Sequence, residues 1–330
     1  MNTAGKITAF AAGLAVSFGA AYGVGYAIDP VTSGEPAAHT AHRAGGAEGH
    51  QGGADSRSGA AAEAAHAPGG LQIAENGYRL ALRTPRIDAG EDTDLRFTVL
   101  DRKGRPVTAF RTEHGKELHL ILSSRDLTTY RHLHPTRAAD GTWRTGVKLP
   151  RAGDYRLFAD FTPDVKGGEN LTLGADLAVG GAYRPAELPA PGRTATVDGY
   201  TVTLDGILRP GAESELTLKV AKDGRPVTDL DPYLEAYGHL VALRGGDLGY
   251  LHVHPHGEPG DGSTRPGPDI SFTATAPSAG TYRLFLDFQH EGTVRTAAFT
   301  VRVGGSADDA KPATGGKPAA PEHSDGGHRH

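Results

Sequence analysis

The sequence contains no cysteine, and its single methionine is Met1. Without cysteine there can be no disulfides, no thiolate metal ligands and no thiol nucleophile. With one methionine, a thioether site for Cu(I) is excluded as well. Any metal site must therefore be built from histidine, aspartate, glutamate and backbone oxygen.

Aromatic residues and charge are also sparse. Aromatics make up 7% of the 330 residues while glycine is abundant, so part of the chain cannot belong to a packed core. The formal net charge is −5, and no block of lysine or arginine occurs. We therefore expect no nucleic-acid partner.

A long apolar stretch occurs once, over residues 7–28, after Lys6 and before Asp29 and Pro30. It is long enough to cross a bilayer. It predicts a membrane anchor or signal segment over residues 1–29, either an uncleaved anchor or a signal peptide cleaved at a small-x-small site. Lys6 favours a body outside the cytoplasmic membrane, which is then a single-pass membrane protein, or a secreted one if the signal is cleaved.

Two segments have the composition of disordered chain. Residues 30–70 form an Ala/Gly/His-rich tether, and residues 304–330 form a tail of similar character. The histidines in the tether, among them His39 and His66, either trap metal weakly or are incidental polar residues.

The remaining chain has short alternating runs separated by Gly, Pro and Asp, a pattern typical of mainly β proteins. It predicts two tandem immunoglobulin-like antiparallel β-sandwiches after the N-terminal helix, at 71–180 and 194–303, joined by a Pro-rich linker at 181–193. We expect strands in the first unit at 78–83, 94–100, 117–122, 130–134, 142–149, 154–161 and 171–179. In the second unit we expect them at 200–204, 215–220, 238–243, 250–254, 270–276, 281–288 and 293–303.

The two units are internal repeats. Asp101–Thr108 matches Lys222–Thr228, and Ala152–Phe161 matches Ala279–Phe288. In the second match, Tyr155 and Tyr282 each follow an Ala-Gly turn, which resembles the tyrosine corner of immunoglobulin-like domains.

Histidines recur at the same places in both units. A single histidine precedes a His-x-His-Pro by thirteen residues in each copy, from His119 to His132 and from His239 to His252. Alternate residues of a strand lie on one face, so two such imidazoles can converge on one ion. If the neighbouring strands pair, each copy gathers three imidazoles, with an outward aspartate as a fourth ligand or a partner that orients an imidazole. The predicted metal ligands are His119, His132, His134 and Asp160 in the first unit, and His239, His252, His254 and Asp287 in the second.

Imidazole and carboxylate ligands suit Cu(II) or Zn(II). The alternative is that the histidines shape the turns before Pro135 and Pro255 by bonding loop carbonyls. Repetition does not decide between these interpretations, because both halves would also inherit a structural turn. Asp126 and Asp247, in the loops between the histidine strands, are expected to cap turns rather than to bind metal.

The run His-Leu-x-x-x-Ser-x-Asp-Leu-x-x-Tyr-x-His-x-His-Pro at 119–135 resembles a motif of exported bacterial tandem immunoglobulin-like β-sandwich proteins. These proteins are largely uncharacterised and often occur with heavy-metal-binding or copper-handling proteins. The second copy lacks the serine and has a shorter Asp-to-Tyr step. The resemblance implies an extracytoplasmic protein that holds a metal for storage, delivery or sensing, with an envelope or metal-handling partner.

The alternative function is a non-catalytic interaction or structural module of the cell envelope. Neither reading is an enzyme. Copper-zinc superoxide dismutase also places a His-x-His on a strand of an immunoglobulin-like barrel, but its cysteine pair and long zinc loop are missing here. No Ser-His-Asp or phosphate-loop pattern supports hydrolysis.

Overall fold

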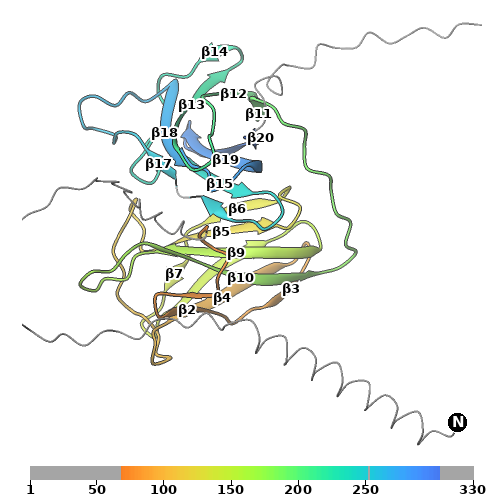
Figure 1. Ribbon diagram of the computed structural model, residues 1–330, viewed down its shortest axis with the longest axis vertical. Helices are drawn as coiled ribbons and strands as arrows, with labels where there is room; N and C mark the ends of the chain where they lie inside the picture. The colour runs from red at the N-terminus through yellow and green to blue at the C-terminus, as the bar shows by residue number, and fades with distance from the viewer. Residues whose placement is uncertain (1–67, 252, 305–330) are drawn as a thin grey trace, which may run out of the picture. The chain divides into compact units, whose positions relative to one another are not determined.

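The computed structural model describes residues 68–251 and 253–304. The predicted membrane segment, the tail beyond Gly304 and the tether up to residue 67 lie outside these residues, as does His252. Among the described residues, no helix has the length and apolar character needed to span a membrane. The described chain consists of strands and loops, and it forms two β-sandwiches, as the sequence predicts (Figure 1).

The first sandwich contains two five-stranded sheets, with strand orders β1-β2-β4-β8-β7 and β3-β10-β9-β5-β6. All its strand pairs are antiparallel except β3 with β10. Its strands are β1 (Ala74–Glu75), β2 (Tyr78–Leu82), β3 (Arg86–Asp88), β4 (Asp92–Leu100), β5 (His119–Ser124), β6 (Tyr130–Leu133), β7 (Thr136–Arg137), β8 (Thr142–Lys148), β9 (Gly153–Phe161) and β10 (Leu171–Gly180).

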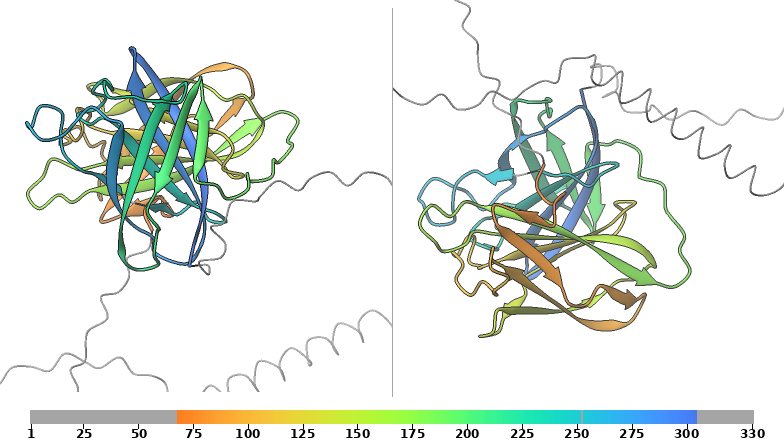
Figure 2. Two further views of the ribbon diagram at one scale, coloured as in Figure 1. Left: turned by 90° about the horizontal axis from the view of Figure 1, so that it is seen from above. Right: turned by 60° about the horizontal axis from the view of Figure 1, so that its bottom comes forward.

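The second sandwich repeats this plan, with a sheet of order β11-β12-β13-β18-β17, to which β14 is added, and a sheet of order β16-β15-β19-β20. Figure 2 gives further views, with its strands running from green to blue. They are β11 (Thr194–Val197), β12 (Tyr200–Asp205), β13 (Glu213–Lys222), β14 (Arg225–Pro226), β15 (His239–Arg244), β16 (Tyr250–Leu251), β17 (Val253–Pro255), β18 (Asp269–Thr275), β19 (Gly280–His290) and β20 (Thr293–Val303).

Both tyrosine corners form as expected. The Tyr155 hydroxyl donates to the Arg151 carbonyl at 3.0 Å, and the Tyr282 hydroxyl donates to the Ser278 carbonyl at 2.9 Å. Each ring is buried in the core of its own sandwich. This pair of bonds supports the immunoglobulin-like class on geometric grounds.

Strands β9 and β19 are buried on both faces. On β9, Tyr155 and Leu157 point into the core of the first sandwich, while Phe158 belongs to a different apolar cluster. That cluster joins both sandwiches and contains Ile121, Leu127, Tyr130, Phe158, Val241, Leu243, Leu248 and Phe285. Side chains alternate between the two faces of a strand. On β9 and β19, apolar side chains that point away from the strand's own core, such as Phe158 and Phe285, therefore pack against the other sandwich.

Equivalent residues of the two copies meet across this contact. Tyr130 stacks on Phe285 with ring centroids 4.1 Å apart, and Phe158 contacts Tyr250 at 5.7 Å. Leu127 and Leu248 hold left-handed backbone conformations, with φ of 57° and 64°. Such a conformation is strained for leucine, but it places both side chains in the shared cluster.

Two expectations about element boundaries differ from the structure. The predicted strand over 250–254 is divided: β16 pairs with β15, whereas β17 pairs with β18 in the other sheet. In addition, the last residues of the predicted tether are held in place. Gly70 N donates to the Thr172 carbonyl at 2.7 Å, and Arg156 donates to the Gly70 carbonyl. Gly174 lies so close to that carbonyl that a Cβ would collide with it.

Candidate metal centre

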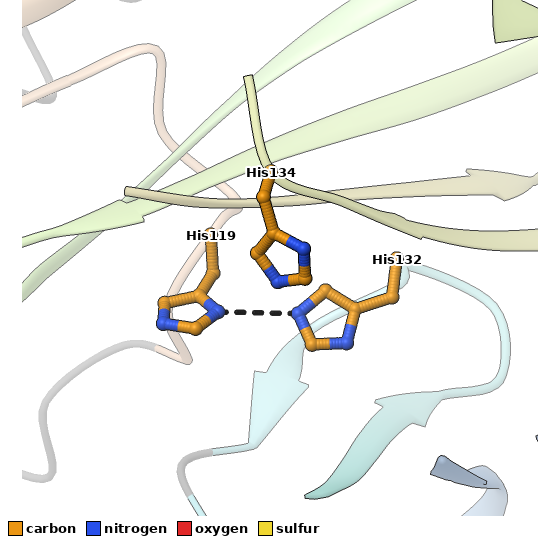
Figure 3. A group of neighbouring side chains, drawn as sticks. All are labelled: His119, His132 and His134. Atoms are coloured by element: carbon orange, nitrogen blue, oxygen red, sulfur yellow. Dashed lines mark hydrogen bonds between the residues drawn. The ribbon is translucent and has the colours of Figure 1, made fainter. Parts of the chain in front are cut away.

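The three histidines of the first copy converge. His119 begins β5, His132 lies on the neighbouring strand β6, and His134 follows that strand. One nitrogen from each ring lies within 4.8 Å of the others, and no other group of this kind occurs among the described residues. The rings point toward one another (Figure 3).

Outer hydrogen bonds fix the tautomer of His119. Its Nε2 lies 3.1 Å from the carbonyl oxygen of Glu113. A carbonyl can only accept, so Nε2 carries the hydrogen, and in the neutral ring Nδ1 holds the lone pair. Burial, aided by neighbouring histidines, lowers the pKa of His119 to about 3, so the ring is neutral near pH 7.

His132 is oriented from the second sandwich. Its Nδ1 lies 2.9 Å from Asp287 Oδ2, and both side chains are almost fully buried. The same carboxylate accepts hydrogen bonds from the hydroxyls of Tyr130 (3.1 Å) and Thr296 (2.5 Å). With Nδ1–H donated to Asp287, the Nε2 of a neutral His132 also holds a lone pair.

These two lone pairs face each other. His119 Nδ1 and His132 Nε2 are 3.2 Å apart. Two imidazole nitrogens bound to one tetrahedral metal at the usual bond length would be about 3.3 Å apart. Two acceptors at this distance require either a proton between them, which makes His132 an imidazolium, or a cation beside them.

His134 completes the group. Its Nε2 is buried and has no hydrogen-bond partner among the described residues. Burial and the neighbouring His132 and His119 lower its pKa to about 3, so this ring is also neutral near pH 7. Its ring centroid lies 5.2 Å from that of His119 and 4.7 Å from that of His132. A group of three imidazoles suits Cu(II) or Zn(II).

The second copy does not gather its histidines in the same way. His239 begins β15 and is 8% exposed, but His254 lies on β17, in the other sheet, and is exposed. His254 is thus not on a strand paired with β15, as the prediction assumed, although it lines the same cleft as His239. The predicted triad of His239, His252 and His254 stays a prediction. His252 lies outside the described residues.

The carboxylates of Asp160 and Asp287 do not make equivalent contacts in the two copies. Asp287 pairs in register with His239, as Asp160 does with His119, yet the Asp287 carboxylate contacts His132 of the other copy. The side chain of Asp287 points away from its own core but is buried between the sandwiches. The Asp160 carboxylate accepts a hydrogen bond from Asn170 at 2.8 Å and another from Tyr250, a residue of the second sandwich whose pKa burial raises far above its usual value.

The two loop aspartates cap turns, as expected. Asp126 accepts hydrogen bonds from the Ser124 hydroxyl and from the Thr128 backbone and hydroxyl, and Asp247 accepts one from the Gly249 backbone. Neither aspartate belongs to the histidine group.

A matched pair of turns supports the single histidines, and the sequence reading missed it. Residues 113–116 and 233–236 are equivalent turns whose two central residues have positive φ, as in type I′ turns. In each, the first carbonyl, of Glu113 or Tyr233, accepts from Nε2 of the histidine six residues later. Aligning the copies would have revealed the six-residue spacing, but not the hydrogen bond.

The chain belongs to the family described as Domain of unknown function (DUF8832), whose model matches it twice, over residues 72–179 and 195–305. The two matches agree with the two repeated sandwiches. No curated protein matches this chain.

Solved structures with some likeness include three bacterial proteins. The Escherichia coli adhesin FdeC is 16% identical, with 70% of this chain and 65% of that chain covered and a TM-score of 0.22. InvD of Yersinia pseudotuberculosis is 14% identical, with coverage of 70% and 58% and a TM-score of 0.22. A putative membrane-anchored protein from Corynebacterium diphtheriae is 10% identical, with coverage of 75% and 62% and a TM-score of 0.20. This chain therefore spans less than two thirds of each of them, and at these TM-scores the likeness carries no argument about its function.

Proposed function

We propose that this protein is a non-enzymatic, extracytoplasmic binding protein that holds one Cu(II) or Zn(II) ion at His119, His132 and His134. The observation that supports this is the 3.2 Å approach of His119 Nδ1 to His132 Nε2, with the other nitrogen of each ring already bonded to an acceptor. A metal ion satisfies both lone pairs and also the orphaned nitrogen of His134.

The surroundings favour a divalent ion of intermediate softness. The ligands are neutral imidazoles, and the nearby carboxylate of Asp287 acts on one of them through its Nδ1–H, which raises the basicity of the ligand. Three ligands leave a fourth position for water or for an exchanging partner. Storage, delivery and sensing are all compatible with such a site, and an envelope or metal-handling protein is the expected partner.

A second candidate function has its own support. In the alternative, the domains form an interaction or structural module of the cell envelope, and His132 is an imidazolium that joins Asp287 to His119. The hydrogen bonds of Tyr130 and His132 to Asp287 link the two sandwiches, which is what a purely structural role requires. The two candidates differ in one measurable respect: only the first needs a metal.

The test is a titration of the full chain with Zn(II) and with Cu(II), followed by calorimetry and by metal content after desalting. We expect His119→Gln, His132→Gln and His134→Gln each to lose one equivalent. His254→Gln is the matched control, because it removes the exposed counterpart of His134 in the second copy. Histidines outside the described residues are the same in all variants, so they cancel in the comparison.

If the three triad variants bind as many ions as the unmodified protein, the metal-binding function is overturned. The interaction or structural module of the cell envelope is then the remaining candidate. Thermal unfolding of each metal-free variant shows whether the fold survives. The expectation of a body outside the cytoplasmic membrane is tested separately, by labelling the surface of intact cells.

A further inference from the structure

A cleft of about 470 Å³ lies beside the triad. Its lining includes His119 and His132 together with Asp160, His239 and the acidic residues Glu113 and Glu235. None of the described residues that line it is a lysine or an arginine. Its electrostatic character therefore favours cations.

The buried histidine of the second copy presents a lone pair to this cleft. His239 is 8% exposed, and its Nε2 lies 3.0 Å from two carbonyl oxygens, those of Tyr233 and Leu234. Both oxygens can only accept, so Nε2 carries the hydrogen and Nδ1 of the neutral ring holds the lone pair. No hydrogen-bond partner of Nδ1 occurs among the described residues, although more than nine tenths of the residue is buried.

Ring separations show which histidine this lone pair can act with. Two imidazoles that bind one tetrahedral ion have centroids roughly 5 Å apart. The separations within the triad are 4.7 to 5.5 Å. His239 is farther from the triad, at 6.4 Å from His119 and 6.2 Å from His132, but it is 5.2 Å from His114. His239 is thus too far away to be the fourth ligand of the first ion, and it lies at ligand spacing from His114.

His114 comes from the turn that supports His119. It is exposed at the cleft, and its backbone has φ of 50°. The equivalent turn of the second copy has Leu234 at this position, so the first copy alone provides an imidazole here. Glu235 belongs to the equivalent turn of the second copy and adds negative charge to the lining of the cleft.

We propose a second binding position for a divalent transition-metal ion in this cleft, with His114 and His239 as its two imidazole ligands and water at its remaining positions. Each sandwich contributes to it. The inference extends the proposed function to a centre that holds two ions, and it rests on that function in taking the ion to be the same kind, Cu(II) or Zn(II).

The experiment counts ions in the full chain with Zn(II) and records the Cu(II) electron paramagnetic resonance spectrum. We expect His114→Asn and His239→Gln each to lose one equivalent and to retain the triad ion. They should also abolish the magnetic interaction between the two Cu(II) ions. Asparagine accepts the left-handed backbone of residue 114, and glutamine keeps an N–H donor for the two carbonyls. His256→Asn is the control, since it removes an exposed imidazole that does not line this cleft.

The outcomes separate the two proposals. If the triad variants lose an ion while His114→Asn and His239→Gln lose none, the second position is overturned and the proposed function stands. If the triad variants lose none, the proposed function is overturned, whatever the other two variants do. Loss of an ion in His256→Asn as well would show that the ion count responds to any exposed histidine, and would overturn the second position.

Discussion

The two copies of the histidine pattern have the same spacing but different geometry. In the first copy, strand β6 stays paired with β5 as far as Leu133, so His132 remains beside His119. In the second, β16 leaves β15 after Leu251, and β17 pairs with the other sheet. His254 therefore lies on a strand of the other sheet, although it lines the same cleft as His239. Equal spacing in the sequence therefore does not guarantee equal sites, because the residue at which a strand changes sheets decides which side chains meet.

The aspartates show a similar contrast. Asp287 is 2% exposed and orients a histidine of the other sandwich, whereas Asp160 borders the open cleft and accepts from Asn170. The duplication thus produced one histidine group that is supported by parts of both copies. Four pairs of equivalent residues allow this asymmetry to be tested.

The largest expected effect comes from Phe285 and its counterpart Phe158, which are both buried between the sandwiches. Replacing either by alanine should lower the free energy of unfolding by about 3–5 kcal/mol, as for other buried phenylalanines. Only Phe285→Ala should also weaken metal binding at the triad, because Phe285 stacks on Tyr130 next to Asp287. Denaturant unfolding and metal titration measure the two effects. Equal effects of both variants on metal affinity would contradict the asymmetry.

The aspartates come next. Asp287→Asn should reduce the metal affinity of the triad by about 10–100-fold, the usual loss when the partner of a ligating histidine is removed. Asp160→Asn should leave that affinity within about twofold, since its carboxylate accepts hydrogen bonds from Asn170 and Tyr250. Competition with a chromophoric chelator gives both values. A similar loss in both variants would show that the cleft charge, rather than the hydrogen bond to His132, governs affinity.

The third test uses pH. Burial lowers the pKa of His119 to about 3 and that of His239 to about 4, below the unfolded value near 6.5. Below pH 6.5 the unfolded chain binds protons that the folded rings do not. The two buried neutral histidines should therefore contribute their full stabilisation of the metal-free protein above that pH. The free energy of unfolding should fall as the pH drops toward 4. The slope is at most about 1.4 kcal/mol per pH unit for each histidine.

His119→Gln and His239→Gln should each make that slope shallower, and by similar amounts, since both rings are buried against a turn carbonyl. Urea unfolding at a series of pH values provides the measurement. A slope unaffected by both substitutions would place the acid sensitivity elsewhere.

The smallest effect is expected from the tyrosine hydroxyls. Tyr130→Phe removes a donor to the buried Asp287 and should cost about 1–2 kcal/mol of stability. Tyr250→Phe should cost less, because water can replace the lost donor at the partly exposed Asp160. Thermal unfolding of both variants compares them. If Tyr250→Phe lowers the stability more than Tyr130→Phe does, then Asp160 depends more on its tyrosine donor than Asp287 does, contrary to this prediction.

Much of the fold could be predicted locally. Alternation and turn residues predicted most of the longer strands, with small shifts at their ends, because period-two burial and Gly-containing turns act over a few residues. The prediction does not include the short strands β1, β3, β7, β11 and β14. A strand of two to four residues is too short to show a periodic pattern. The tyrosine corners followed from the Ala-Gly turn before each tyrosine.

The sequence by itself determined the duplication, the two sandwiches and the fact that any metal site must use imidazole and carboxylate. It also predicted that His119 meets His132 and His134, but the same spacing predicted a second triad on paired strands, which the strand pairing does not repeat. Only the tertiary structure decided that Asp287 reaches across to His132, that His254 lies in the other sheet from His239, and that His114 lies beside His239. Each depends on how two sheets face each other and on where one strand changes sheets, and long-range packing sets both.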